Sequence, residues 1–403
     1  KQMKNCYRPV RCRKIADNKY QFFNHNYFEN TALSVKYTYF TNGVETYSST
    51  FDVNIAPQSS QEYEIDSLEL EKDNHNSVVF EYLAGDFLIA SEQIILSEGK
   101  LSADINSDGK TAVKPSENKL YITFDNGSMI FDKSTGFITS YIYKNYEMIN
   151  SFPLGDFKGF APAFYRAPLD NDRNICKYWH TMGLQNTSNI CKGSSFTDNG
   201  DNIVVTTNIK SLANCILPVA NTQIKYTIYP NGNILVDVNC LGGGAVKLLP
   251  RFGVMLEMPK EYENIKYFGL GEDVNLPDYK EHTINKIYQT TVDKLKEDYI
   301  KPQESATRCD VRFAEITNAS GFGLRFEAVN KPFIFSASHY TSNQWAKAMH
   351  RDDLVDLPTT CVNIDSSVLG AGSNACGPLP DKKDRVGSLS GKKLSFVVKP
   401  IGE

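Results

Sequence analysis

Short stretches in which apolar and polar residues alternate, each closed by a turn-forming pair, restrict most strongly how this chain can fold. Leu33, Val35, Tyr37 and Tyr39 alternate at period two, and Asn42-Gly43 then supplies residues that tolerate the positive φ of a hairpin turn. The chain is also 12% aromatic, with 22 Tyr and 23 Phe, and such residues favour half-buried strands. The same pattern predicts two further hairpins, with strands at Leu120–Phe124 and Met129–Phe131 and at Ile224–Tyr229 and Ile234–Val238. The sequence therefore predicts an all-β fold.

The 403 residues suffice for two or three domains at roughly 150 residues each. Residues 1–98 are predicted to form an immunoglobulin-like β-sandwich, because short strands continue at Thr50–Ile55, Val78–Leu83 and Gln93–Leu96. Residues 99–118 lose the alternation and are rich in Ser, Asp, Asn, Gly and Lys, which is typical of a linker. Residues 119–403 contain more hairpins than a simple sandwich holds. We expect a large, curved, many-stranded structure there.

One helix is predicted close to the end of the chain. Thr341 and Gln344 have the spacing of a capping box, in which each side chain satisfies a backbone N–H of the first turn. Trp345, Ala348 and Met349 follow at helical spacing and are expected to form one buried stripe.

Charge and cysteine content exclude several classes of partner. The formal net charge of -4 argues against a basic surface for nucleic acid or an anionic membrane, and no apolar run is long enough to span a bilayer. The nine cysteines are scattered without a CxxC pair, which favours free thiols in a reducing compartment and predicts a cytoplasmic location.

The chain starts at Lys1 without an initiator methionine or a signal peptide, so we expect a segment of something longer.

The residues by themselves predict no catalytic or metal site. Motifs for nucleotide binding and for an activated serine are missing, the strand–helix alternation of a (β/α)8 barrel is missing, and the six histidines are dispersed. Two acidic pairs, Asp170/Asp172 and Asp352/Asp353, could serve acid–base chemistry. Asp352 and Asp353 follow the predicted helix and are more simply explained as its solvated end.

The segment around Asp170 is more distinctive. It reads Phe164-Tyr-Arg-Ala-Pro-Leu-Asp-Asn-Asp-Arg173, in which Pro168 fixes φ and the Asp-Asn-Asp run favours a turn. Physical chemistry alone favours a structural loop with internal hydrogen bonds, in which a carboxylate pairs with Arg166.

At this segment the sequence resembles the C-terminal part of glycoside hydrolase family 2 β-galactosidases, which carry an R-A-P-x-D-N-D string in their last large domain. Further matches occur in the order expected for that family and cover nearly the whole chain. They are Tyr7-Arg-Pro-Val10, Val53–Pro57, Glu92-Gln-Ile94, Arg251-Phe-Gly253, Phe268–Asp278, Tyr299–Glu304, His339-Tyr-Thr341, Val362–Asp365 and Gly370–Asn374.

The resemblance implies an immunoglobulin-like β-sandwich followed by a large β-supersandwich similar to galactose mutarotase, the β-galactosidase small-chain domain. It also implies that the catalytic glutamates, and the Mg2+ and Na+ of the whole enzyme, belong to a (β/α)8 barrel that this segment lacks. The segment alone is then expected to be inactive. Its implied partners are the barrel of the same or a partner chain and a β-galactoside, within an enzyme of the retaining class that forms a homo-oligomer.

Five residues are implied as substrate contacts by resemblance. Asn171, Asp172, Arg173 and Asn174 fall on the loop that approaches the substrate pocket in the family. Cys361 stands where family members often carry an aromatic residue, Trp in some, that stacks on a sugar, and a thiol offers no ring face. Two alternatives stay open: a stand-alone carbohydrate-binding module, and an aldose mutarotase with Glu327 as base and His339 as acid.

Overall fold

The computed structural model describes residues 1–403 except 102, 104, 106–107, 150–158 and 403. Antiparallel strands joined by short connections dominate it, which confirms the all-β prediction. Its described residues group into two compact units. The first comprises Lys1–Lys100, Phe268–Glu272 and Tyr279–Tyr288, and the second comprises Leu101–Tyr267, Asp273–Asp278 and Gln289–Glu403.

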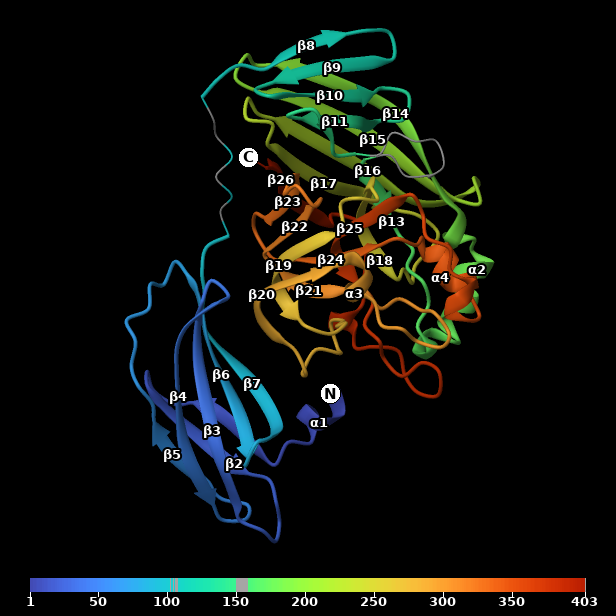
Figure 1. Cartoon of the computed structure of the whole chain (residues 1–403). Helices are drawn as coiled ribbons and strands as arrows, with labels where there is room; N and C mark the ends of the chain where they lie inside the picture. Colours follow the sequence, from blue (N-terminus) through green and yellow to red (C-terminus); the bar gives the residue numbers. More distant parts are fainter. Residues whose placement is uncertain (102, 104, 106–107, 150–158, 403) are drawn as a thin grey trace. The chain divides into compact units, whose positions relative to one another are not determined.

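The N-terminal 100 residues of the first unit form two antiparallel sheets over one core (Figure 1). The core is aromatic and includes Phe22 and Phe80, both fully buried, whose ring centroids lie 5.5 Å apart. The first sheet has three strands, β1 (Val10–Lys14), β2 (Lys19–Asn24) and β5 (Ser60–Glu64). The second has four, in the order β4 (Val44–Ile55), β3 (Thr31–Thr41), β6 (His75–Ala84) and β7 (Phe87–Glu98). A short helix, α1 (Gln2–Cys6), precedes both. This is the predicted two-sheet sandwich.

The first predicted hairpin shows why the local pattern sufficed. Leu33, Val35, Tyr37 and Tyr39 are all buried on β3, as period-two alternation requires. At the turn, Asn42 and Gly43 have φ of 49° and 78°, and two positive φ angles are those of a type I′ turn.

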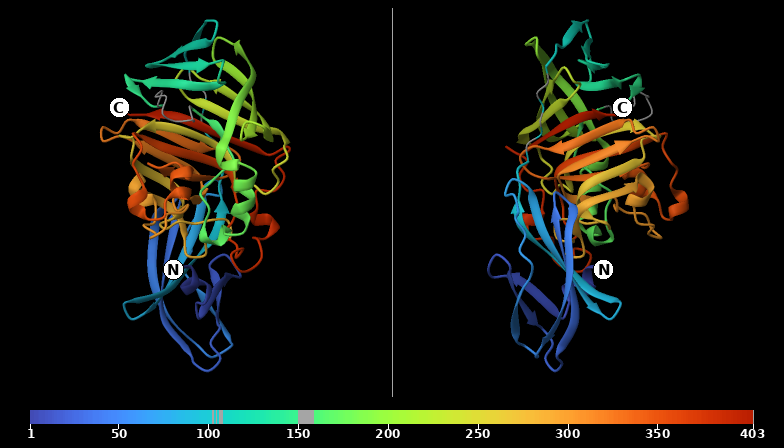
Figure 2. Two further views of the ribbon diagram at one scale, coloured as in Figure 1. Left: turned by 90° about the vertical axis from the view of Figure 1, so that its right-hand side faces the viewer. Right: turned by 60° about the vertical axis from the view of Figure 1, so that its left-hand side comes forward.

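The described residues after Lys100 form three further sheets, two of five strands and one of nine (Figures 1 and 2). The first is β12 (Tyr146–Glu147), β11 (Phe137–Tyr143), β10 (Gly127–Asp132), β9 (Lys119–Phe124) and β8 (Ala112–Pro115). The second is β13 (Ala161–Ala163), β18 (Arg251–Pro259), β25 (Thr359–Val368), β24 (Phe333–Ser338) and β21 (Arg308–Val311). The nine-stranded sheet, in spatial order, is β14 (Thr187–Asp198), β15 (Ile203–Ala213), β16 (Leu217–Ile228), β17 (Ile234–Gly243), β26 (Lys393–Ile401), β23 (Gly323–Ala328), β22 (Phe313–Thr317), β19 (Asn264–Gly271) and β20 (Ile284–Thr291).

Both remaining hairpins lie where the turn residues place them. Phe124 of β9 pairs with Gly127 of β10, and Ile228 of β16 pairs with Ile234 of β17. The segment predicted as a linker, 99–118, contains the strand β8, which pairs with β9. Residues 102, 104 and 106–107 of that segment lie outside the described residues.

Short helices follow or connect the strands, and they are α2 (Ile175–Thr181), α3 (Val292–Leu295), α4 (Ser342–Lys347) and the 3-10 turns η1 (Asp170–Asp172), η2 (Leu184–Asn186), η3 (Arg351–Asp353) and η4 (Lys382–Asp384). The predicted helix is α4, and its capping box is present: the Gln344 N–H donates to Thr341 Oγ1 at 3.1 Å. Trp345 and Ala348 are buried as predicted, but the prediction for Met349 was wrong, since it is 61% exposed. The helix ends at Lys347 and Ala348 is already extended, so Met349 lies off the helical stripe.

The two faces of the five-stranded sheet around β18 and β25 differ sharply. Their register places Val254 and Leu256 beside Ile364 and Val362 on an apolar face. The opposite face pairs Met255 with Asn363 and Glu257 with Cys361, and it also carries Asp365 opposite Gly253. The second face, although buried, is therefore the polar one.

Candidate functional site

The R-A-P-L-D-N-D segment is a loop built around a buried ion pair. The guanidinium Nη1 of Arg166 lies 2.6 Å from Asp172 Oδ2, and the two side chains are 0% and 2% exposed. Asp172 Oδ2 also accepts the N–H of Leu169 at 2.8 Å, which closes the η1 turn. Arg166 further donates to the carbonyls of Ala167 and Leu369. The expectation that a carboxylate pairs with Arg166 is confirmed.

Hydrogen bonds join this loop to a second one, residues 370–374. Asn171 Nδ2 donates to the Gly372 carbonyl at 2.7 Å, and Asn174 Nδ2 donates to the Asn374 carbonyl at 2.7 Å. Asn374 Oδ1 in turn accepts the Ile175 N–H at 3.0 Å. Residues 171–175 and 370–374 thus form one double loop, which we call the rim.

Asp278 anchors the second loop of the rim. Its Oδ1 accepts the Ala371 N–H at 2.6 Å and its Oδ2 accepts the Gly372 N–H at 2.8 Å, so both carboxylate oxygens are used. A Cβ at Gly370 would lie 2.5 Å from Asp278 Oδ1, which explains why the loop begins with glycine.

Asp278→Asn is expected to loosen the rim without unfolding the second unit. The amide replaces one acceptor with a donor that faces a backbone N–H, so at least one charge-assisted bond is lost. We expect the Ala371 and Gly372 amides to exchange with deuterium about ten times faster or more, a change that corresponds to about 1.4 kcal/mol. Asp381→Asn is the matched control, because Asp381 is exposed in the same region. Equal exchange rates in both variants would contradict the anchor role.

The predicted contact residues differ in accessibility. Arg173 and Asn174 are exposed and Asn171 is half-buried, whereas Asp172 is buried and its carboxylate shapes the loop. Cys361 is 2% exposed and packs with Ala163 and Met255 on the polar face of the sheet. The structure thus groups Asn171 to Asn174 on the rim and places Cys361 on β25.

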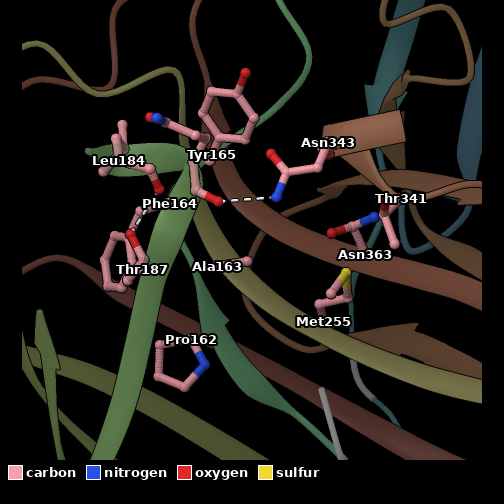
Figure 3. A pocket seen from close by; sticks show the side chains of 12 residues that line it. Pro162, Ala163, Phe164, Tyr165, Leu184, Thr187, Met255, Thr341, Asn343 and Asn363 are labelled. Carbon is pink, nitrogen blue, oxygen red and sulfur yellow. Dashed lines mark hydrogen bonds between the residues drawn. The ribbon is translucent and has the colours of Figure 1, made fainter. Parts of the chain in front are cut away.

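A pocket opens beside this loop, over the polar face of the sheet (Figure 3). It has an empty volume of about 490 Å³, part of which is open solvent. Figure 3 shows Thr341, Asn343 and Asn363 on one side and Phe164, Leu184 and Thr187 on the other. The lining residues are Pro162, Ala163, Phe164, Tyr165, Leu184, Gln185, Thr187, Met255, Thr341, Ser342, Asn343 and Asn363. Residues before Arg166 and the start of α4 therefore share one cavity.

Under the pocket lies a buried charge cluster that the sequence did not reveal. Arg251 donates through Nη1 to Asn363 Oδ1 at 2.9 Å, and its Nε lies 3.0 Å from Asp365 Oδ2 in an ion pair whose angle is not that of a hydrogen bond. Glu304 Oε2 lies 3.8 Å from Arg251 Nη2. Arg251, Glu304 and Asp365 each belong to a segment given above for the family resemblance. That resemblance was the only feature of the sequence that singled them out.

Asp365 makes the stability of this cluster dependent on pH. Burial raises the pKa of Asp365 to about 7, and the Glu304 carboxylate adds to the rise while Arg251 opposes it. Between about pH 4 and pH 7 the Asp365 carboxyl is therefore protonated in the native state and ionised in the unfolded chain. Stability therefore falls as pH rises through that window, by up to about 1.4 kcal/mol per pH unit.

Asp365→Asn removes this titration. Between pH 5 and pH 7 we expect the free energy of unfolding to fall by at least about 1 kcal/mol more in the wild type than in the variant, as measured by urea denaturation. A stability difference between the two proteins that stays constant over this range would show that Asp365 does not titrate there.

The other candidates have structural partners. Glu327 lies on β23 and forms ion pairs with Arg325 and Lys399, which lower its pKa despite partial burial. His339 is buried after β24, and its Nδ1 lies 3.3 Å from the Thr359 carbonyl. Asp352 and Asp353 are exposed on the turn η3 that follows α4, where Asp353 Oδ2 accepts the N–H groups of Met349 and His350.

The described part of the chain shows three further properties. All nine cysteines are free thiols. Among the described residues, no three His, Cys, Asp or Glu side chains gather as a candidate metal site. No helix in the described ranges combines the length and the apolar character needed to cross a membrane.

Comparison with known proteins identifies the family. Residues 123–398, more than half of the chain, match the Beta galactosidase small chain family, so the chain belongs to that family. The chain is 30% identical over 397 residues to the beta-galactosidase of Actinobacillus pleuropneumoniae, which covers 94% of this chain and 37% of that protein. The beta-galactosidase of Halalkalibacterium halodurans is 25% identical over 368 residues, covering 87% of this chain and 35% of that protein.

The chain thus spans little more than a third of the length of these curated relatives. It corresponds to a C-terminal portion of them, and its described residues contain no (β/α)8 barrel. Among solved structures, the galactose 1-epimerase of Lactobacillus acidophilus aligns with a TM-score of 0.44 at 10% identity, over 73% of this chain and all of that one.

Proposed function

We propose that this chain is the part of a retaining β-galactosidase that supports the catalytic barrel and completes its substrate pocket. The rim carries the proposal. Three hydrogen bonds, donated by Asn171, Asn174 and Ile175, fix the two loops to each other. The side chain of Arg173 takes no part in them and is exposed. A fixed loop with a free cationic donor is suited to contact a sugar hydroxyl.

In this proposal the chemistry lies outside the chain. Two carboxylates of the barrel would act as acid/base and nucleophile on a terminal β-D-galactoside, and the Mg2+ and Na+ implied by the family would be held mainly there. Asn171, Arg173 and Asn174 would border the aglycone, with Asp172 shaping their loop, and Cys361 would contribute from β25. The nine free thiols support a reducing, cytoplasmic location, and we propose that the whole enzyme forms a homo-oligomer.

The proposal is tested by assaying a nitrophenyl β-galactoside. The 403-residue chain alone should release no nitrophenol above the blank, whereas the same chain with the upstream barrel region should hydrolyse it. Activity of the chain alone would overturn the proposal.

A stand-alone carbohydrate-binding module is the second candidate, and the pocket of Figure 3 favours it. Under this candidate, calorimetry with galactose and lactose should show binding, and the outcome that separates it from the first candidate is that the protein with its upstream region stays inactive.

A further inference from the structure

The pocket beside the rim has a lining that selects an uncharged ligand. None of its lining side chains is an acid, a lysine, an arginine or a histidine. Its one titratable group is the Tyr165 phenol, and burial raises the pKa of that group above its ordinary value, so it stays neutral. A charged ligand would lose its hydration there without gaining a counter-charge.

Two amides in the lining are fixed in orientation. Asn363 is 8% exposed, and its Oδ1 is held by Arg251 Nη1 at 2.9 Å, so that Nδ2 remains as its hydrogen-bond donor. Asn343 Nδ2 donates to the Gln185 carbonyl at 2.9 Å, so that Oδ1 remains as its acceptor. Gln185 Oε1 is a further acceptor, buried and without a partner among the described residues. One cavity thus offers a donor and acceptors at set positions.

The rest of the lining is apolar. Phe164, Leu184 and Met255 contribute carbon surface, and Tyr165 contributes a ring whose hydroxyl is 3.2 Å from His180 Nε2. A pyranose ring presents this same mixture, with hydroxyls around its edge and C–H groups on its faces.

We propose that this pocket binds one uncharged sugar ring, with Asn363 as donor and Asn343 as acceptor. The site is built entirely from residues of the second unit, so binding there requires no catalytic barrel. Phe164 and Tyr165 directly precede Arg166, so an occupied pocket also borders the loop that carries the rim. The inference does not rest on the proposed role in hydrolysis, because hydrolysis could fail while the sugar still binds, and it names the site that the second candidate function would use.

The test follows the methyl group of Met255, which lines the pocket. The protein is labelled with 13C-methyl methionine, and the Met255 signal is assigned by its loss in Met255→Leu. Methyl 1-thio-β-D-galactopyranoside, which resists hydrolysis, is the probe, and glucuronate is the charged control. We expect a saturable shift with the thiogalactoside at millimolar concentration and none with glucuronate.

Asn343→Ala should weaken the binding at least tenfold, while Asn199→Ala, an exposed asparagine between β14 and β15, should leave it unchanged. Ser342→Leu, which adds a larger side chain to the lining without removing an amide, should abolish the shift if Asn343→Ala disturbs folding. A Met255 signal that does not respond to the thiogalactoside in the wild type, or that responds as strongly in Asn343→Ala and in Ser342→Leu as in the wild type, would overturn the proposal.

Discussion

Arg166→Ala is expected to lower the free energy of unfolding of the second unit by about 3–5 kcal/mol. The substitution leaves the Asp172 carboxylate, 2% exposed, without the guanidinium that lies 2.6 Å away. It also removes the donors to the Ala167 and Leu369 carbonyls and the contact of the guanidinium with the Trp179 ring, 5.7 Å from its centroid. An uncompensated buried charge is the main cost.

Urea denaturation of the wild type and the variant measures this loss directly. Two further proteins make the result specific. Arg173→Ala removes the same charge from an exposed position of the same loop and should change stability little. The double variant Arg166→Met, Asp172→Leu removes both charges together and should lose clearly less than Arg166→Ala alone. Equal losses in the single and the double variant would refute the buried-pair explanation.

The sequence predicted those parts of the fold that are fixed by neighbouring residues. The hairpin turned at Asn42-Gly43 requires only that two adjacent residues accept positive φ. The capping box of α4 requires only Thr341 and Gln344 at the correct spacing. The length of α4 was not predictable in this way, because Ala348 could have continued the helix. It is extended in the structure, and this left Met349 exposed.

The helix α2 escaped sequence analysis for a physical reason. It has seven residues with only Ile175 and Trp179 buried, too few for a helical stripe. Its N-cap residue, Asn174, makes no side-chain cap, and the Ile175 N–H is accepted instead by Asn374 Oδ1 from the second loop of the rim. A tertiary contact thus replaced the local signal.

The site was predictable only in part, because its residues come from distant segments. The pairing of Arg166 with a carboxylate could be expected, since Asp172 is six residues away. The cluster of Arg251 with Glu304 and Asp365 brings together residues that are between 53 and 114 positions apart. The proximity of Arg251 and Asp365 depends on the register of β18 with β25, which no local pattern encodes. Glu304 reaches them from the segment between α3 and β21.

Arg173→Ala tests the central claim, that the rim of this chain contacts the substrate of a β-galactosidase. Arg173 is exposed, and none of its side-chain atoms has a partner within the described residues, so its removal should leave the melting temperature unchanged within about 1 °C. If the side chain binds a sugar hydroxyl, its loss should lower kcat/KM about 10-fold to 100-fold, as expected for one charged hydrogen bond.

The measurement is kcat/KM on a nitrophenyl β-galactoside for the protein that includes the barrel, as wild type, Arg173→Ala and Lys177→Ala. Lys177 is exposed on α2, four residues after Arg173. The Lys177→Ala substitution therefore removes an equal charge from a position outside the rim. The account predicts a fall of at least about tenfold for Arg173→Ala only. Equal values for all three proteins, at equal melting temperatures, would contradict it.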